Sequence, residues 1–280
     1  MGKITMTVLV ENESAQAGLS SEHGFSLFIS IPPYGILFDT GQGGAIRGNM
    51  EQLGVCREDV THFILSHGHY DHANGLPVFQ EMKRKIPAFI HPMAVLPRYA
   101  VRPGDVRYIG MCRDHLRILG HFENPLDETF TTFRIDDQLF IGGHFAYEND
   151  FEKSSGPFYS DERGEHPDLF EDELALGIRT REGLVVVSGC SHHGIVNITR
   201  QMLRYGGCSR LRAVVGGLHL GGTSLEKRER TARELRKAGL GSLYAGHCTG
   251  KEALDSFRQI LGEENVHPIP AGTVITLEKD

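Results

Sequence analysis

The stretch SHGHYDHANGL, residues 66–76, brings together four side chains that can bind a metal ion or move a proton: His67, His69, Asp71 and His72. The apolar run FIL precedes it, which predicts a short buried strand leading into a polar loop. In an extended segment alternate side chains share a face, so His67, His69 and Asp71 would point one way and His72 aside. Imidazole and carboxylate are the ligands of hydrolytic zinc sites, so the pattern favours a metal site over a polar surface loop.

Two adjacent metal ions need more ligands than one loop provides, and three later strands offer them. The predicted strands 184–189, 211–217 and 242–246 each end in a loop that bears histidine and then leads into a helix. These loops carry His192 and His193 in CSHHG, His219 in LHLGG, and His247 in HCTG. Functional sites of α/β proteins gather at the carboxyl ends of strands. The similar order of features in 63–76 and 185–198 predicts two β/α halves that face each other across a shared site.

Composition excludes several classes of protein. The net charge of -7 argues against a nucleic-acid surface built on positive charge, and no apolar run reaches the roughly 18 residues of a membrane-spanning helix. The first residues, MGKITMTVLVEN, lack the features of an export signal, and the five cysteines include no CxxC pair. We therefore expect a cytoplasmic protein with a small-molecule substrate, anionic or phosphorylated as one option, and without membrane or nucleic-acid partners. The oligomeric state is left open.

The whole chain, residues 1–280, is predicted to form one domain. Residues 25–41 have the pattern of a strand hairpin, residues 44–55 that of a helix, and residues 74–85 can carry a second helix. Periodicity is poor from about 92 to 172, which predicts a long loop-rich insertion with two short strands in FTTFRIDDQLFIGG. Such loops are usually functional or lid-like, a variable surface insertion being the alternative.

The motif HGHYDH, with FDTG upstream and a helix after it, resembles the His-x-His-x-Asp-His signature of the metallo-β-lactamase superfamily. That resemblance implies an α/β fold, a four-layer α/β/β/α sandwich with a dinuclear metal site at one edge between the two sheets. More narrowly, EDELALGIRTREGLVVVSGCSHHGIVNI, VVGGLHL and AGHCTG resemble the branch of dihydropterin ribofuranosyl-aminobenzene-phosphate synthase-like hydrolases. The resemblance covers nearly the whole chain. The Gly-His-Thr and Gly-Asp-Thr loops of the wider superfamily are missing, and SGCSH occupies the place of the second.

The resemblance also implies roles for single residues. His67 and His69 would bind the first metal, and Asp71, His72 and His247 the second. His219 would lie close by as a proton donor to a leaving group, with a packed loop histidine as the alternative. The cofactors would be two divalent ions, zinc by default and iron or manganese as alternatives, because the ligand types suit all three.

The loop CSHHG leaves a choice for the third ligand of the first metal. Cys190 directly follows a strand, where a small thiol is most often a buried apolar filler. His192 lies two residues on and can share that face, whereas His193 should turn the opposite way. The branch resemblance adds that the first histidine after Cys-Ser recurs. We predict His192, which would complete a three-histidine site of the catalytic zinc type, with Cys190 as the runner-up.

Three further positions carry expectations. Asp39 in FDTG is expected to accept hydrogen bonds from ligand histidines or loop amides rather than to bind metal. The GQGG turn, the helix starting near Ala45 and the adjacent Arg47 are expected to meet a phosphate or carboxylate of the substrate, a plain helix start being the alternative. The remaining histidines, His23 among them, are expected to be surface or packed loop residues.

Three functions fit this pattern. The leading one is a metal-dependent hydrolase that attacks an ester or phosphoester with metal-bound hydroxide, with Asp71 and His219 as catalytic residues. The branch implies an alternative, a synthase that joins a pterin precursor to an aminobenzene ribose phosphate, on whose rings Phe151, Phe158 and Tyr159 could stack. A non-haem iron oxidoreductase is the second alternative. A sensor with a degenerate site is disfavoured because the motif is intact.

Overall fold

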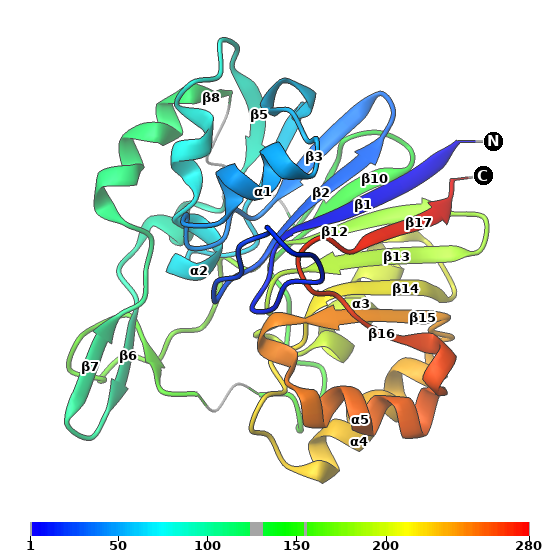
Figure 1. Ribbon diagram of the computed structural model, residues 1–280. Helices are drawn as coiled ribbons and strands as arrows, with labels where there is room; N and C mark the ends of the chain where they lie inside the picture. Colours follow the sequence, from blue (N-terminus) through cyan, green and yellow to red (C-terminus); the bar gives the residue numbers. More distant parts are fainter. Residues whose placement is uncertain (1, 124–130, 154–155, 280) are drawn as a thin grey trace.

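The computed structural model describes residues 2–123, 131–153 and 156–279, and most of its strands form two seven-stranded mixed sheets that pack face to face (Figure 1). In spatial order, the first sheet contains β17 (Val274–Glu278), β1 (Lys3–Val10), β2 (Ser26–Ile31), β3 (Tyr34–Phe38), β4 (His62–Ile64), β5 (Ile86–Phe89) and β8 (Phe122–Glu123). The second contains β16 (Val266–Pro268), β15 (Ser242–Gly246), β14 (Leu211–Gly217), β13 (Gly183–Ser188), β12 (Ala175–Thr180), β10 (Leu139–Gly142) and β9 (Thr132–Arg134). The two termini lie side by side, because β1 pairs with β17.

Helices cover the outer face of each sheet. The first sheet is covered by α1 (Ile46–Gln52), α2 (Tyr70–Ala73) and the 3₁₀ helices η1 (Arg57–Asp59), η2 (Leu76–Phe79), η3 (Pro92–Val95) and η4 (Arg113–His121). The second is covered by α3 (Ile195–Gly206), α4 (Leu225–Lys237) and α5 (Lys251–Leu261), with η5 (His247–Thr249) and η6 (Glu263–Asn265) at their ends. The predicted α/β/β/α sandwich is therefore confirmed. In the described part of the chain, no helix has the length and apolar character that spanning a bilayer requires.

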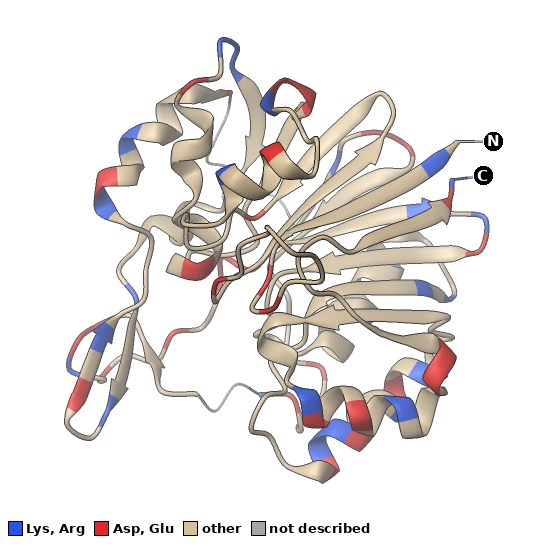
Figure 2. Cartoon of the chain, in the orientation of Figure 1, with Lys and Arg blue, Asp and Glu red and all other residues tan. Residues whose placement is uncertain are grey.

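The apolar pattern explains the layers. In β1 the alternate residues Ile4, Met6 and Val8 face the core between the sheets. Strand β13 is buried on both faces, with Val185 and Val187 in that inner core and its other apolar residues under the helices. Charged side chains lie mainly on the outer helices and loop tips, whereas the strands carry few of them (Figure 2).

Strands β13, β14 and β15 pair in parallel, and α3 and α4 are the crossovers between them. Parallel pairing brings the carboxyl ends of the three strands to one edge of the sheet. The histidine-bearing loops that follow these strands are thereby placed at the same edge, as the sequence predicts.

The insertion predicted at 92–172 contains more regular structure than expected. Strands β6 (Tyr99–Arg102), β7 (Asp105–Tyr108) and β11 (Phe158–Tyr159) form a separate three-stranded sheet, and β6 and β7 extend away from the sandwich (Figure 1). Strands β9 and β10 confirm the two strands expected in residues 130–143, of which residue 130 lies outside the described residues. Residues 124–129 and 154–155 of the insertion also lie outside them.

Two local predictions are wrong. The segment after His69 is not extended, because Tyr70–Ala73 form the short helix α2. The helix expected within 74–85 is only the 3₁₀ helix η2 (Leu76–Phe79), with Pro77 in its first turn.

Candidate metal centre

Five histidines from loops that follow strands meet at one edge between the two sheets. His67 and His69 follow β4 of the first sheet, and His192, His219 and His247 follow β13, β14 and β15 of the second. The short helix α2 adds Asp71 and His72. Each sheet thus contributes part of the site, as the repeated strand-loop-helix pattern predicts.

The first group consists of His67, His69 and His192, whose ligand atoms all lie within 4.8 Å of one another. All three side chains are buried. Among the described residues, no hydrogen-bond partner reaches Nε2 of His67, Nε2 of His69 or either ring nitrogen of His192. Buried polar atoms without a partner are costly, and three neutral imidazoles that converge on one point fit a divalent metal ion.

Burial keeps these imidazoles in the form that binds metal. It lowers the pKa of His69 to about 3 and the pKa values of His67 and His192 well below the ordinary histidine value. Neighbouring groups hold the rings in place. The Ser66 hydroxyl lies 2.9 Å from Nδ1 of His67, and Phe170 stacks on His192 with ring centroids 4.1 Å apart.

The second group consists of Asp71, His72 and His247. Nε2 of His72 lies 3.2 Å from Nε2 of His247, and Oδ2 of Asp71 lies 3.4 Å from Nε2 of His247 and 3.9 Å from Nε2 of His72. Two imidazoles and a carboxylate therefore converge beside the first group, and the rings of His67 and His72 are 4.2 Å apart. This donor set also fits a divalent ion.

Asp39 supports both groups without joining either. Nδ1 of His72 donates to its carboxylate at 2.7 Å, and the backbone N–H and hydroxyl of Ser66 each donate to it at 2.7 Å. The expected role of Asp39 as an acceptor for ligand histidines and loop amides is confirmed. Burial lowers the pKa of His72, but the charges of Asp39 and Asp71 outweigh burial and raise that pKa to about 9.

Residues after β1 hold the second group from the other side. The His247 backbone N–H donates to Glu11, and Nδ1 of His247 lies 3.0 Å from Oδ1 of Asn12. Nε2 of His23 lies 3.1 Å from Oδ2 of Asp71. His23 is exposed, as expected of a surface histidine, and its ring in addition contacts a member of the second group. Glu11 and Asn12 directly follow a buried strand, a signal that the sequence analysis did not use.

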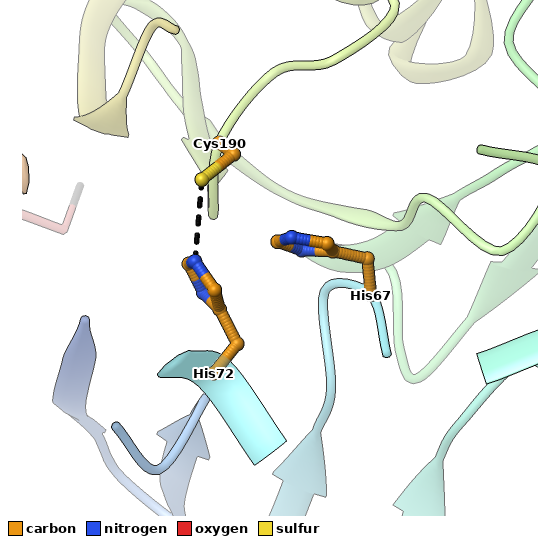
Figure 3. A group of neighbouring side chains, drawn as sticks. All are labelled: His67, His72 and Cys190. Atoms are coloured by element: carbon orange, nitrogen blue, oxygen red, sulfur yellow. Dashed lines mark hydrogen bonds between the residues drawn. The ribbon is translucent and has the colours of Figure 1, made fainter. Parts of the chain in front are cut away.

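Cys190 lies between the two groups. It is buried, as a filler would be, but its Sγ is 3.2 Å from Nε2 of His72 (Figure 3). Its thiol belongs to candidate ligand sets with His67 and His72, with His192 and His219, and with His247 and Cys248. The description of Cys190 as an apolar filler is therefore incomplete, since the thiol points into the site.

A buried carboxylate fixes the loop CSHHG. The backbone N–H groups of His192 and His193 donate to the two oxygens of Glu173 at 2.6 and 2.8 Å, and Nδ1 of His193 lies 2.8 Å from the same carboxylate. His193 is thus turned towards Glu173, while His192 joins His67 and His69. Among the described residues, His193 belongs to no candidate metal group, in keeping with the prediction that it points the other way.

A second buried network holds the loop after β4. Asp172 accepts the backbone N–H of Gly68 at 2.7 Å and pairs with Arg98 at 2.6 Å, and Arg98 also pairs with Asp168 at 3.0 Å. The sequence analysis missed these residues and Glu173, because they lie in or beside the insertion, and the three carboxylates are about a hundred residues from the motif.

His219 lies beside the first group, with its ring 4.4 Å from that of His192. Phe158 packs near both, with ring centroids 5.7 Å from each. These residues line a cavity of about 190 Å³ that also reaches Asp71, His247 and Arg102. Of the aromatic residues expected to stack on a substrate, Phe158 lies at the site, whereas Phe151 packs under the guanidinium of Arg230.

The anion site expected at the GQGG turn is contradicted. The backbone N–H groups of Gly43, Gly44 and Ala45 donate to the carboxylate of Glu22 at 3.1, 2.9 and 3.0 Å. Arg47 pairs with Glu81 at 3.0 Å. The chain's own carboxylate therefore takes the place that the sequence analysis assigned to a substrate anion.

Comparison with known proteins identifies the family. Residues 23–199 match the profile of the metallo-beta-lactamase superfamily. The chain is 32% identical to the 7,8-dihydropterin-6-methyl-4-(beta-D-ribofuranosyl)-aminobenzene-5'-phosphate synthase of Methanocaldococcus jannaschii, over 91% of this chain and 90% of that protein. It is also similar to the crystal structure of a metal-dependent hydrolase of the β-lactamase superfamily, with a TM-score of 0.83, 31% identity and coverage of 99% of this chain and 100% of that one.

A metallo-β-lactamase fold protein from Bacillus subtilis, at 15% identity and a TM-score of 0.57 over 98% of this chain and 100% of that one, shares the fold. The profile match, the relative at 32% identity and the sandwich with its histidine-rich edge agree with one another. The chain belongs to the metallo-β-lactamase superfamily.

Proposed function

We propose that this protein is a metal-dependent hydrolase that holds two divalent ions and cleaves an ester or phosphoester. The observation that carries the proposal is the convergence of three buried imidazoles whose free nitrogens have no hydrogen-bond partner among the described residues. His67, His69 and His192 would bind one ion, and Asp71, His72 and His247 the other. When bound, such ions supply Lewis acidity and lower the pKa of water from about 16 towards about 7.

The chain's own residues would orient the nucleophile, protonate the leaving group and exclude bulk water. Asp71 lies between His247 and His23, so its carboxylate can both bind a metal and orient a nearby water. His219 lies beside His192 at the cavity wall, where its imidazole can donate a proton to a leaving group. Phe158 and Phe170 pack around His192 and exclude water from that side.

A substrate screen tests the reaction class. Protein reconstituted with zinc, manganese or iron is offered phosphodiesters, phosphomonoesters, lactones and thioesters, and metal content is measured in parallel. We expect metal-dependent cleavage in one class and less than a tenth of that turnover in Asp71→Ala. A metal content well below one ion per chain after reconstitution, or turnover in Asp71→Ala close to that of the wild type, would contradict the proposal.

Zinc is the proposed metal, because a three-histidine set with a position left for water is typical of catalytic zinc. Iron or manganese would suit the same ligands. Colour and iron content of the purified protein distinguish a non-haem iron oxidoreductase from a zinc hydrolase. The proposal further includes a small-molecule substrate and a cytoplasmic location, which the five free cysteines support.

A synthase is the second candidate, because the relative from Methanocaldococcus jannaschii is named as one. The position of Phe158 at the cavity wall supports a flat aromatic substrate. Incubation with a dihydropterin precursor and ribofuranosylaminobenzene 5'-phosphate, followed by mass spectrometry, tests this alternative. A joined product favours the synthase, whereas hydrolysis without joining favours the hydrolase.

A further inference from the structure

A second cavity adjoins the metal centre and extends away from it towards α4. It has a volume of about 430 Å³ and lies between the loop after β14, the start of α4 and Glu152. His192 and His219 form the wall that it shares with the smaller cavity above the metal groups. A molecule that occupies both cavities would place one part at the metals and another part beside α4.

Lys227 supplies a positive charge to this larger cavity. It lies in the first turn of α4 and is half-buried, and no ion-pair partner for it occurs in the described ranges. Burial lowers the pKa of its ammonium group, while the charge of Glu152 opposes that effect. A partly desolvated ammonium without a close counter-ion is stabilised by an anionic ligand.

Glu152 does not meet that need directly. Its two oxygens accept the backbone N–H groups of Val196 and Asn197, each at 2.9 Å, and one of them also accepts the side-chain amide of Asn149 at 2.8 Å. The carboxylate is thus engaged at the start of α3. Lys227 remains available to a ligand.

The start of α4, the glycine-containing loop before it and a buried imidazole line the same cavity. The first N–H groups of a helix have no partner within the helix, and at the start of α4 the Ser224 side chain caps that of Lys227 at 3.2 Å. Gly222, with a φ of +73°, leaves open space where a side chain would stand. His192 is only 3% exposed, and its unpartnered ring lines the cavity wall.

We propose that this cavity binds a phosphate monoester group of the substrate, with Lys227 as the residue that recognises it. The proposal rests on the hydrolase function above, because it places the reacting bond at the metal centre and the phosphate beside α4. A phosphate dianion offers several acceptor oxygens, which match an ammonium group in the first turn of a helix. The cavity has the size of a small-ligand site.

Calorimetric titration of the metal-loaded protein with ribose 5-phosphate, and with ribose as the uncharged control, tests the proposal. We expect Lys227→Met to weaken ribose 5-phosphate binding at least tenfold and Lys227→Arg to restore much of it. Lys237→Met is the matched control, since Lys237 is exposed on the same helix and pairs with Glu234. The affinity of this variant for ribose 5-phosphate should stay within twofold of the wild-type value. Ribose should bind weakly to every variant.

The His67→Ala variant distinguishes phosphate binding in this cavity from phosphate binding at the metals. Binding that survives His67→Ala but falls with Lys227→Met supports the cavity site. Binding that is lost with His67→Ala and unchanged by Lys227→Met overturns it. If the reconstituted protein hydrolyses no substrate while ribose 5-phosphate binding still depends on Lys227, the hydrolase proposal fails and the phosphate site stands.

Discussion

Asp39 illustrates how a residue outside the two metal groups can control both of them. Its carboxylate is fully buried and receives hydrogen bonds from His72 and from two groups of Ser66, which in turn contacts His67. The residue adopts a φ of +58°, a conformation that non-glycine residues rarely use. The surrounding hydrogen bonds stabilise that conformation.

Replacing Asp39 by asparagine tests this role. Both carboxylate oxygens of Asp39 accept hydrogen bonds, whereas asparagine has one oxygen and an NH₂ group, so either Nδ1 of His72 or the backbone N–H of Ser66 loses its acceptor and the His72 ring is held less firmly. We expect metal affinity at the second group to fall about ten- to a hundredfold, the usual effect of removing such a support. Competition with a chelator measures it, and Glu81→Gln on the exposed surface is the control. Equal affinities in wild type and Asp39→Asn would contradict the assignment.

The pKa of His72 predicts how the stability of the metal-free protein depends on pH. That pKa is raised from an unfolded value of about 6.5 to about 9, so the folded state binds the proton more tightly. The resulting stabilisation is fully present below about pH 6.5 and is lost as the pH rises through about 9.

Denaturant titrations of the chelator-treated protein measure this effect. The free energy of unfolding of the wild type, relative to His72→Gln, should fall by on the order of 2–3 kcal/mol between pH 6.5 and 9. The exposed His121→Gln variant should follow the wild type. A difference between wild type and His72→Gln that stays constant over this range would refute the prediction.

Sequence reasoning succeeded for residues whose local pattern carries the information. His192 and His193 differ by one position, and the alternation of side chains separates the one that meets His67 from the one that meets Glu173. It failed for Arg47, because the amides of the GQGG turn are taken by Glu22, some twenty residues earlier in the chain. No local pattern shows that such a side chain folds back.

At the scale of elements, the loop between β13 and α3 depends on one carboxylate. Glu173 precedes β12 and accepts three hydrogen bonds from His192 and His193 across the sheet edge. The spacing of apolar residues shows where strands, crossover helices and the loops at the carboxyl ends of strands lie. Most of these elements were therefore predicted correctly. The short helix α2 did not follow from it, since four residues are too few for a helical pattern to be visible.

Glu173→Gln tests the control of this loop. Three N–H donors point at the carboxylate, and a glutamine offers one oxygen and an NH₂ group that opposes a donor. We expect a loss of about 1–3 kcal/mol in the free energy of unfolding, the cost of an unsatisfied buried donor, together with weaker metal binding by His192. The neighbouring exposed residue gives the matched control, Glu171→Gln, which should change neither quantity. A Glu173→Gln protein with wild-type stability and metal content would disprove this role.

At the scale of the whole molecule, the site exists only when the two sheets pack together. His67 and His69 come from the first sheet and His192 from the second, and the core between the sheets holds them in register. Contacts across the sheets, such as that of Glu11 with His247, were not predictable from the sequence. They join residues far apart in the chain through the tertiary fold alone.

Metal removal should therefore destabilise the entire fold. A ligand that binds only the folded state at a hundred times its dissociation constant adds about 2.7 kcal/mol to the free energy of unfolding. We expect chelation to lower the melting temperature of the wild type, and zinc to restore it. In His67→Ala the response to zinc should be much smaller. A wild-type melting temperature that is insensitive to chelation and reconstitution would argue against metal ligands from both sheets.

The central claim is that His67, His69 and His192 form one metal site and that His193 is not part of it. Metal stoichiometry after reconstitution and gel filtration, measured for the wild type, His192→Ala and His193→Ala, tests it most directly. We predict two ions per chain in the wild type, the loss of about one ion in His192→Ala, and near wild-type content in His193→Ala. Loss of metal in His193→Ala with full occupancy in His192→Ala would contradict the account.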